Sequence, residues 1–220
     1  SIYIRGSVPV GSYIPGISDV DTFAYIKASS IENGEHFRLK KSFQYLEEKY
    51  SVTKVEFQII PISQLNVDSK EYSFHKAFTL KCQSLCVYGD SLQSQLNDFY
   101  LTKEFAEKFS FDYVQHLQPY LNMVESESKN VKVKRICVWL SKRILRAGFH
   151  LVMWRSDVTS FTRDLYLNYK EFSCVYPQYD SQMKKVLSYA VYQSLSLDEL
   201  LPLFIELGNF LDSEYKRLFK

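Results

Sequence analysis

The sequence has little of what marks disordered or membrane-spanning chains. Among 220 residues there are only seven glycines and six prolines, while 46% are hydrophobic, which excludes a low-complexity or disordered protein. No run of eighteen apolar residues occurs, so a membrane span is not expected. No basic-then-apolar signal segment precedes Ile2. We therefore expect an ordered globular protein in the cytoplasm, without a membrane partner.

Cysteine and histidine are also scarce, and neither is clustered. The four cysteines lack metal-ligand spacing, and Cys82 and Cys86 lie four residues apart in what we interpret as an apolar helix. Free thiols of this kind suit a reducing cytosol. His36, His75 and His116 stand apart from any cysteine or acid cluster, so no zinc site is predicted.

Net charge is close to zero, at +2, and by itself says little about partners. Its distribution is uneven, because residues 129–155 contain eight lysines or arginines and no acid. Such a stretch is typical of a helix that faces an anion, either a triphosphate or nucleic acid, and equally of a solvated helix face. A nucleic-acid partner is therefore not favoured over the other two interpretations.

Two acids occur close to the N-terminus, in the order Ser18-Asp19-Val20-Asp21. Alternate residues of a strand point to the same side, so we expect Asp19 and Asp21 to project together. Two neighbouring carboxylates repel each other unless a cation lies between them. Magnesium is the cation that such oxygen ligands favour, usually together with substrate phosphates.

A Gly-Ser pair precedes these acids and follows an apolar, strand-like run. Gly6 has no Cβ, so backbone amides can approach a phosphate closely there, and Ser7 adds a hydroxyl donor. Arg5 comes directly before the pair, but we expect its side chain to point away from this loop. Together, the Gly-Ser pair and the acids predict a site for a triphosphate and a divalent metal.

The combination of Gly6-Ser7, a loop, Ser18 and Asp19-Val20-Asp21 resembles the nucleotidyltransferase superfamily typified by DNA polymerase beta. That resemblance implies a third acid on a neighbouring strand, and Glu56 lies in the apolar run 53–61. The Val-Glu-Phe placement is most similar to bacterial aminoglycoside nucleotidyltransferases. The motifs cover about the first third of the chain.

The resemblance implies transfer of a nucleoside monophosphate, AMP above all, from ATP or another nucleoside triphosphate to an acceptor hydroxyl, for example on an antibiotic. Asp19, Asp21 and Glu56 would be catalytic and would hold two magnesium ions, with Glu56 as ligand or as base. Gly6, Ser7 and Ser18 would bind the nucleotide. The acceptor is not identified by the sequence.

Arg163 is the candidate nucleotide-binding residue in the C-terminal half. It lies in Ser160-Phe161-Thr162-Arg163-Asp164-Leu165, at an expected helix start, where a basic side chain and free amides favour an anion. Related two-domain enzymes place a basic residue in this region against the nucleotide. The alternative is an ion pair between Arg163 and Asp164 or a neighbouring helix.

Two other functions remain open. Arg143 and His150 resemble the Arg-x(4–6)-His element of bacterial helical ribonucleases of the HEPN type, although we expect Gly148 to end the helix before His150. The other alternative is a binding module that keeps the fold without turnover.

Hydrophobic periodicity predicts an α+β protein with two domains. A nucleotidyltransferase domain with a small mixed sheet is expected at 1–90, without the N-terminal helix usual in the superfamily, and a helical bundle at 91–220. The expected strands are 2–5, 22–26 and 54–60, and the expected helices are 35–50, 73–87, 102–126, one from about 133 to 148, 161–176, 179–194 and 203–219.

Overall fold

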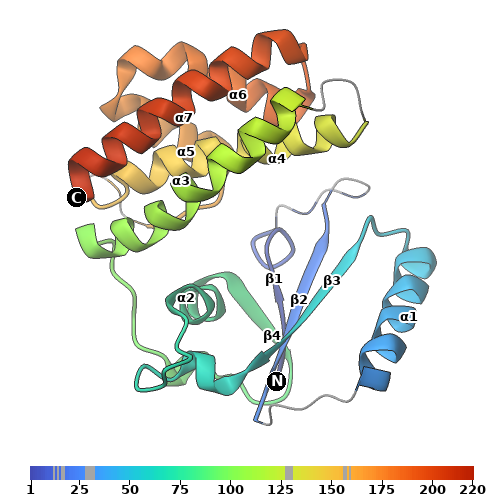
Figure 1. The fold of residues 1–220 in the computed structure, drawn as a ribbon. Coiled ribbons are helices and arrows are strands. Elements are labelled where there is room, and N and C mark those ends of the chain that lie inside the picture. Colours follow the sequence, from blue (N-terminus) through green and yellow to red (C-terminus); the bar gives the residue numbers. More distant parts are fainter. Residues whose placement is uncertain are drawn as a thin grey trace. The chain divides into compact units, whose positions relative to one another are not determined.

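The computed structural model describes residues 1–220 apart from 12, 14, 16–17, 28–32, 127–130, 156–157 and 159. It divides the chain into two compact units, Ser1–Phe99 and Tyr100–Lys220 (Figure 1). The division falls later than the expected 90/91. The first unit contains a sheet and helices, and the second unit is helical, so the α+β class is confirmed.

The first unit is built on a four-stranded mixed sheet. Its strands are β1 (Ile2–Arg5), β2 (Val20–Ile26), β3 (Val55–Pro61) and β4 (Ser84–Tyr88), in the order β3-β2-β1-β4. β2 and β3 are parallel, whereas β1 is antiparallel to both β2 and β4. Three of the four strands were expected from the sequence.

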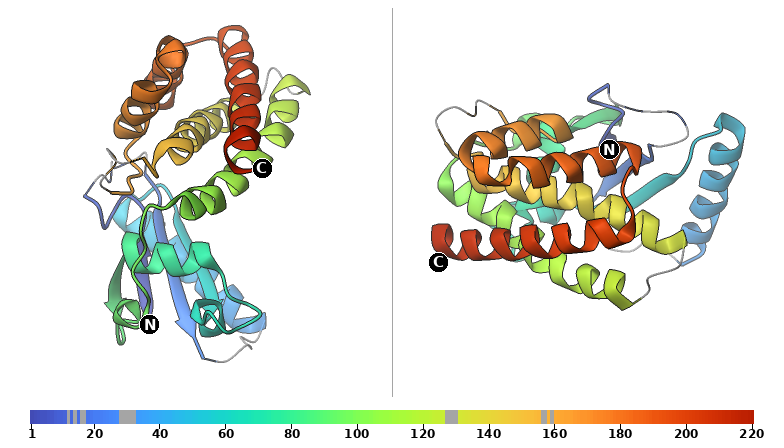
Figure 2. Two further views of the ribbon diagram at one scale, coloured as in Figure 1. Left: turned by 90° about the vertical axis from the view of Figure 1, so that its left-hand side faces the viewer. Right: turned by 90° about the horizontal axis from the view of Figure 1, so that it is seen from above.

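The two faces of this sheet carry different helices (Figures 1 and 2). Alternation along the strands places the aromatic side chains of β1 and β2 on the face that packs against α2 (Phe74–Gln83). α1 (Asn33–Tyr50) contacts β3, and Phe43 lies 5.0 Å from Phe57 between ring centres on the opposite face. The core of the α2 face consists of Tyr3, Phe23, Tyr25, Ile60, Leu65, Ala77 and Leu80.

The predicted helix 73–87 is wrong in its second half. α2 ends at Gln83, and the hydroxyl of Ser84 donates to the carbonyl oxygen of Thr79 at 2.7 Å. The chain then enters β4, which pairs with β1 at the edge of the sheet. Cys86 consequently lies in a strand, whereas the sequence had suggested a helix.

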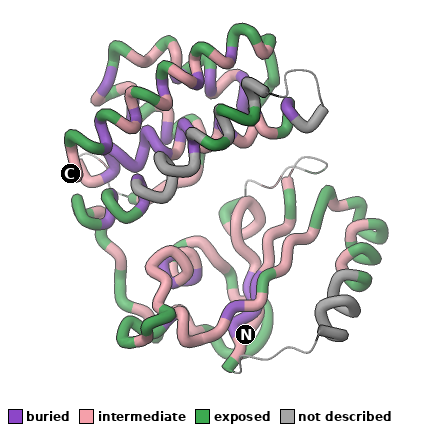
Figure 3. Tube along the Cα trace, in the orientation of Figure 1, coloured by how far each residue is buried: buried purple, intermediate pink, exposed green. Residues whose placement is uncertain are grey.

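The second unit consists of α3 (Lys103–Ser126), α4 (Val131–Val152), α5 (Leu165–Val175), α6 (Asp180–Tyr192) and α7 (Leu197–Phe219). α4 packs against the other four helices (Figure 2). Buried residues gather on the sides of these helices that face one another (Figure 3). The helical interpretation of this half is thus confirmed. The remaining elements are 3-10 turns at Ile62–Leu65, Gln93–Gln95 and Pro177–Tyr179.

Gly148 does not end α4, which continues to Val152. A Cβ at Gly148 would lie 2.5 Å from the Met183 Cε atom and 2.8 Å from the Phe172 Cδ2 atom. Glycine at this point therefore permits the close approach of α5 and α6 to α4. It serves packing and not helix termination.

Two helices of the second unit have an N-cap residue whose side chain accepts a hydrogen bond from a backbone N–H of the first turn. Ser196 and Glu199 form a capping box at the start of α7, and Asp164 accepts the amide of Leu167 at 2.8 Å at the start of α5. The Asp164 cap explains why α5 starts at Leu165, later than the expected residue 161. Within the described ranges, no helix has the length and apolar character needed to cross a bilayer.

Candidate functional site

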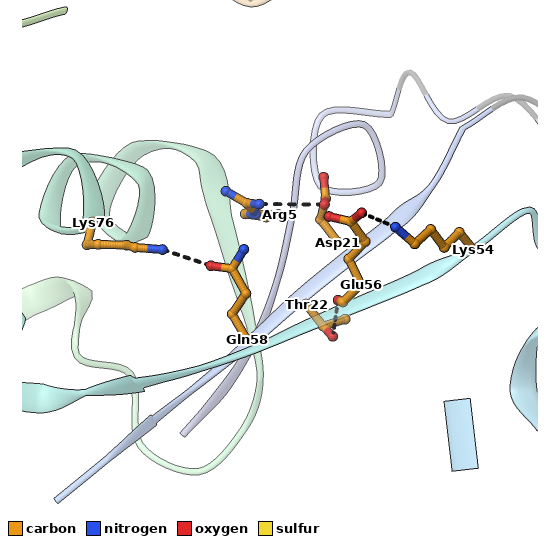
Figure 4. Close-up of polar contacts among 7 residues, drawn as sticks. All are labelled: Arg5, Asp21, Thr22, Lys54, Glu56, Gln58 and Lys76. Atoms are coloured by element: carbon orange, nitrogen blue, oxygen red, sulfur yellow. Dashed lines mark hydrogen bonds and ion pairs between the residues drawn. The ribbon is translucent and has the colours of Figure 1, made fainter. Parts of the chain in front are cut away.

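Three charged residues lie in one row across the sheet of the first unit. Arg5 on β1 is the register partner of Asp21 on β2, and Asp21 is the register partner of Glu56 on β3 (Figure 4). Register partners project from the same face of a sheet. The row therefore lies on the α2 face, beyond the aromatic core formed by Tyr3 and Phe23.

The carboxyl groups of Asp21 and Glu56 are within hydrogen-bonding reach of each other. Arg5 Nη2 lies 3.6 Å from Asp21 Oδ1, so a guanidinium lies beside one acid. Lys54 Nζ lies 2.5 Å from Glu56 Oε1, so an ammonium lies beside the other (Figure 4). The pair of like charges is thus held between two cations, which offset its repulsion.

These contacts change the protonation of Glu56. The hydrogen bond from Lys54 holds the pKa of the Glu56 carboxyl below its ordinary value, and burial acts in the opposite direction. The same contact raises the pKa of Lys54, with smaller contributions from the charges of Asp19 and Glu47. Both groups of this ion pair are consequently charged at neutral pH.

Asp19 lies next to the acid pair without being part of the sheet. It is exposed and comes directly before β2, where Val20 N donates to the carbonyl oxygen of Lys54 at 2.8 Å. Its charge acts on Lys54. The structure therefore brings Asp21 and Glu56 together, and it places Asp19 before β2, where its charge acts on Lys54.

Two features favour glycine at position 6, the backbone conformation and the position of Asp21. Gly6 has a φ of +80°, a conformation that side chains rarely adopt, and a Cβ on it would lie 2.8 Å from Asp21 Oδ2. The Gly-Ser turn thus passes directly over the carboxylate of the second strand. This contact gives a physical reason for the joint occurrence of Gly6 and Asp21.

The other predicted nucleotide-binding residues are Ser7, Ser18 and Arg163. Ser7 is half-buried in the turn after β1, and Ser18 is half-buried just before Asp19. Arg163 belongs to the second unit, where it is half-buried immediately before Asp164, the residue that caps α5. Its neighbour Asp164 is thus occupied with the helix amide of Leu167.

The acid pair has the donor chemistry of a magnesium site. Asp21 and Glu56 offer adjacent carboxylate oxygens, and magnesium is commonly held by one or two carboxylates plus phosphates. Among the residues that the structure describes, no three histidine, cysteine or acidic side chains form a group that could hold a metal. The residues present therefore fit a metal that shares its coordination with a phosphate ligand.

Comparison with known proteins adds nothing to this geometry. No family model matches the chain, and neither a curated protein nor a solved structure matches it. The interpretation of the site as a nucleotidyltransferase site thus depends on the residues and their arrangement.

Four residues around the acid pair were not predicted as site residues: Arg5, Lys54, Gln58 and Lys76. Contrary to expectation, Arg5 points toward Asp21. The signal for it was available, since an antiparallel hairpin that turns at Gly6 pairs the residues flanking the loop. Lys76 had no such signal, because its position depends on how α2 packs on the sheet.

His150, the candidate ribonuclease histidine, is only 1% exposed within α4. Its ring lies 5.2 Å from Phe109, 6.1 Å from Phe149 and 5.7 Å from Phe161, measured between ring centres. An imidazole enclosed by aromatic rings in this way is not accessible to an RNA backbone. The structure gives His150 a packing role.

Proposed function

We propose that the protein is a metal-dependent nucleotidyltransferase that moves a nucleoside monophosphate, AMP above all, from a nucleoside triphosphate to an acceptor hydroxyl. The observation that carries the proposal is the adjacency of the Asp21 and Glu56 carboxyl groups beneath the Gly6 turn. A paired acid placed under a turn without a Cβ suits a phosphate group bridged to the protein by a cation.

The reaction forms one bond and breaks another at the α-phosphorus. The acceptor oxygen attacks this phosphorus, while the bond to the oxygen that bridges the α- and β-phosphates breaks. The electron pair of that bond leaves with pyrophosphate. The proton of the acceptor hydroxyl passes to a carboxylate, and Glu56 would take it if Asp21 alone holds the metal.

The chain's own residues act by position and charge. Asp21 and Glu56 would hold magnesium, which when bound would neutralise charge on the phosphates. Gly6 leaves room for the backbone of the turn to approach a phosphate, with Ser7 as an additional donor. The lowered pKa of Glu56 keeps it ionised at neutral pH, as a ligand or base must be.

The decisive test supplies nucleoside triphosphates with a label on the α-phosphate, together with magnesium and a panel of aminoglycoside, protein and RNA acceptors. Transfer of labelled nucleoside monophosphate supports the proposal, whereas a γ-label should leave with pyrophosphate. Nucleotide binding without any transfer or pyrophosphate release would support the binding-module alternative. RNA cleavage in the absence of metal that is lost in His150→Ala would support the ribonuclease alternative.

A further inference from the structure

In the first unit, the cationic side chains of Arg5 and Lys76 lie on the side of the acid pair that is opposite Lys54 (Figure 4). Arg5 ends β1, and Lys76 lies in the first turn of α2, whose start is capped by Ser73. Lys76 Nζ donates to Gln58 Oε1 at 2.8 Å, and the charge of Arg5 acts on Lys76. Two cationic side chains from separate elements are thus close enough to influence each other, and Arg5 also contacts Asp21 of the row of acids (Figure 4).

Four features of this place disfavour the ammonium of Lys76. It is half-buried, and burial lowers its pKa, followed by the like charge of Arg5. It lies in the first turn of a helix, where the dipole is positive and where α2 has no acidic residue. Gln58, the partner that the described residues provide, is neutral.

A bound anion would offset these effects, because it would pair with the charge of Lys76, screen it from Arg5 and complement the helix terminus. The guanidinium of Arg5 has the planar fork that fits phosphate oxygens, and Lys76 adds a point charge. Asp21 contacts Arg5 at 3.6 Å, so this anion would lie directly beside the proposed metal ligands.

We propose that Arg5 and Lys76 bind the β- and γ-phosphates of the nucleoside triphosphate and hold pyrophosphate as it leaves. This subsite deepens the proposed function and rests on it. Its two cations would stabilise the negative charge that develops on the leaving group when the bond at the α-phosphorus breaks. No proton transfer is required of either residue.

The test is calorimetric titration of sodium pyrophosphate into the full chain in the presence of a chelator, so that the readout is independent of metal and of turnover. Lys76→Gln should weaken pyrophosphate binding about tenfold, which corresponds to the loss of one charge-assisted contact. Lys76→Arg should retain most of the affinity. Lys70→Gln, the same charge change at an exposed residue of the same unit, should leave the affinity unchanged.

A second arm distinguishes the triphosphate from an acceptor phosphate as the natural anion. Saturation with a non-hydrolysable nucleoside triphosphate should abolish pyrophosphate binding, whereas unimpeded binding would overturn the assignment to the leaving group. Equal affinity in wild type and Lys76→Gln, with both proteins melting at similar temperatures, would also overturn the subsite. An equal loss in Lys70→Gln would do so as well, since it would show a diffuse charge effect.

Failure of the subsite and failure of the proposed function are separable. If labelled transfer proceeds and Lys76→Gln binds pyrophosphate like wild type, only the subsite is wrong. If no acceptor receives label, the nucleotidyltransferase proposal fails, whatever the pyrophosphate titration gives. The titration and the transfer assay thus report on different claims.

Discussion

Asp21 and Glu56 are register partners on parallel strands, and their carboxyl groups lie within hydrogen-bonding reach of each other. Adjacent carboxylates repel, so the pair contributes little to stability unless cations are near. Arg5 and Lys54 supply that charge from the flanking positions. The chain itself thus compensates part of the charge of the pair, and a bound divalent cation would add to that compensation.

Glu56→Gln should lower the free energy of unfolding by no more than about 1 kcal/mol, while it abolishes nucleotide transfer. The substitution loses the interactions that lower the pKa of Glu56, above all the ion pair to Lys54, which is largely exposed and therefore worth little. Urea denaturation of both proteins at neutral pH measures the difference. A loss above about 2 kcal/mol would indicate that Glu56 is a structural residue and not a ligand or base.

Gly6→Ala should destabilise the protein more than Gly11→Ala does. Both glycines have positive φ, at +80° and +70°, so each substitution strains the backbone by roughly 1–2 kcal/mol. The added Cβ meets Asp21 only at Gly6, because nothing lies within 4 Å of a Cβ at Gly11. Thermal melts compare the two variants, and equal losses would contradict the contact between the turn and the acid.

Gly148→Ala should destabilise the second unit by about 1–2 kcal/mol, because overlap with Met183 and Phe172 outweighs the gain in helix propensity. Met183→Ala, a cavity-forming change, supplies the test of mechanism. The double variant should lose less than the sum of the two single losses, since the shortened side chain makes room for the new methyl. Strict additivity in chemical denaturation would show that the two residues do not interact.

Glu214 should make stability depend on pH. This residue is only 7% exposed, and its hydrogen bond with Arg217 holds the pKa of the carboxyl below the ordinary value. Burial raises that pKa. The hydroxyl of Tyr176, which lies 2.5 Å from Glu214 Oε1, lowers it further. The pKa of Glu214 is lower in the folded than in the unfolded protein. Its carboxylate therefore contributes its full stabilisation of the folded state above the unfolded pKa of about 4.3, and this contribution is lost as the pH falls through the folded pKa.

Accordingly, Glu214→Gln should lower the free energy of unfolding by roughly 1–2 kcal/mol at pH 7, and the deficit should shrink toward pH 3. The exposed acid Glu206 on the same helix provides the control, as Glu206→Gln should show no comparable change. A deficit that grows on acidification would contradict the assignment of a depressed pKa to Glu214.

Much of the fold and part of the site were predictable because their signals are local. Alternation of apolar residues placed β1, β2 and β3, and the acid-x-acid motif located Asp21. The segment Ser84–Tyr88 was misassigned because a short apolar run fits a helix and a strand equally well. Its strand conformation depends on pairing with β1, which lies far away in the sequence.

The parts of the site that escaped prediction depend on tertiary structure. Lys54 is an exception, because it lies two residues before Glu56 in the expected strand 54–60 and strand alternation already places both side chains on one face. Lys76 and Gln58 meet only after α2 has packed on the sheet. The role of Gly148 likewise depends on Phe172 and Met183, which belong to helices that follow it in the chain.

The most direct measurement compares wild type, Asp21→Asn and Asp68→Asn for the release of pyrophosphate and the transfer of an α-labelled nucleoside monophosphate in magnesium. Asp68 is an exposed acid of the same unit, so its variant controls for the loss of one negative charge. We expect transfer by wild type and Asp68→Asn, and none by a folded Asp21→Asn. Full transfer by Asp21→Asn would contradict the assignment of the acid pair as the reaction centre.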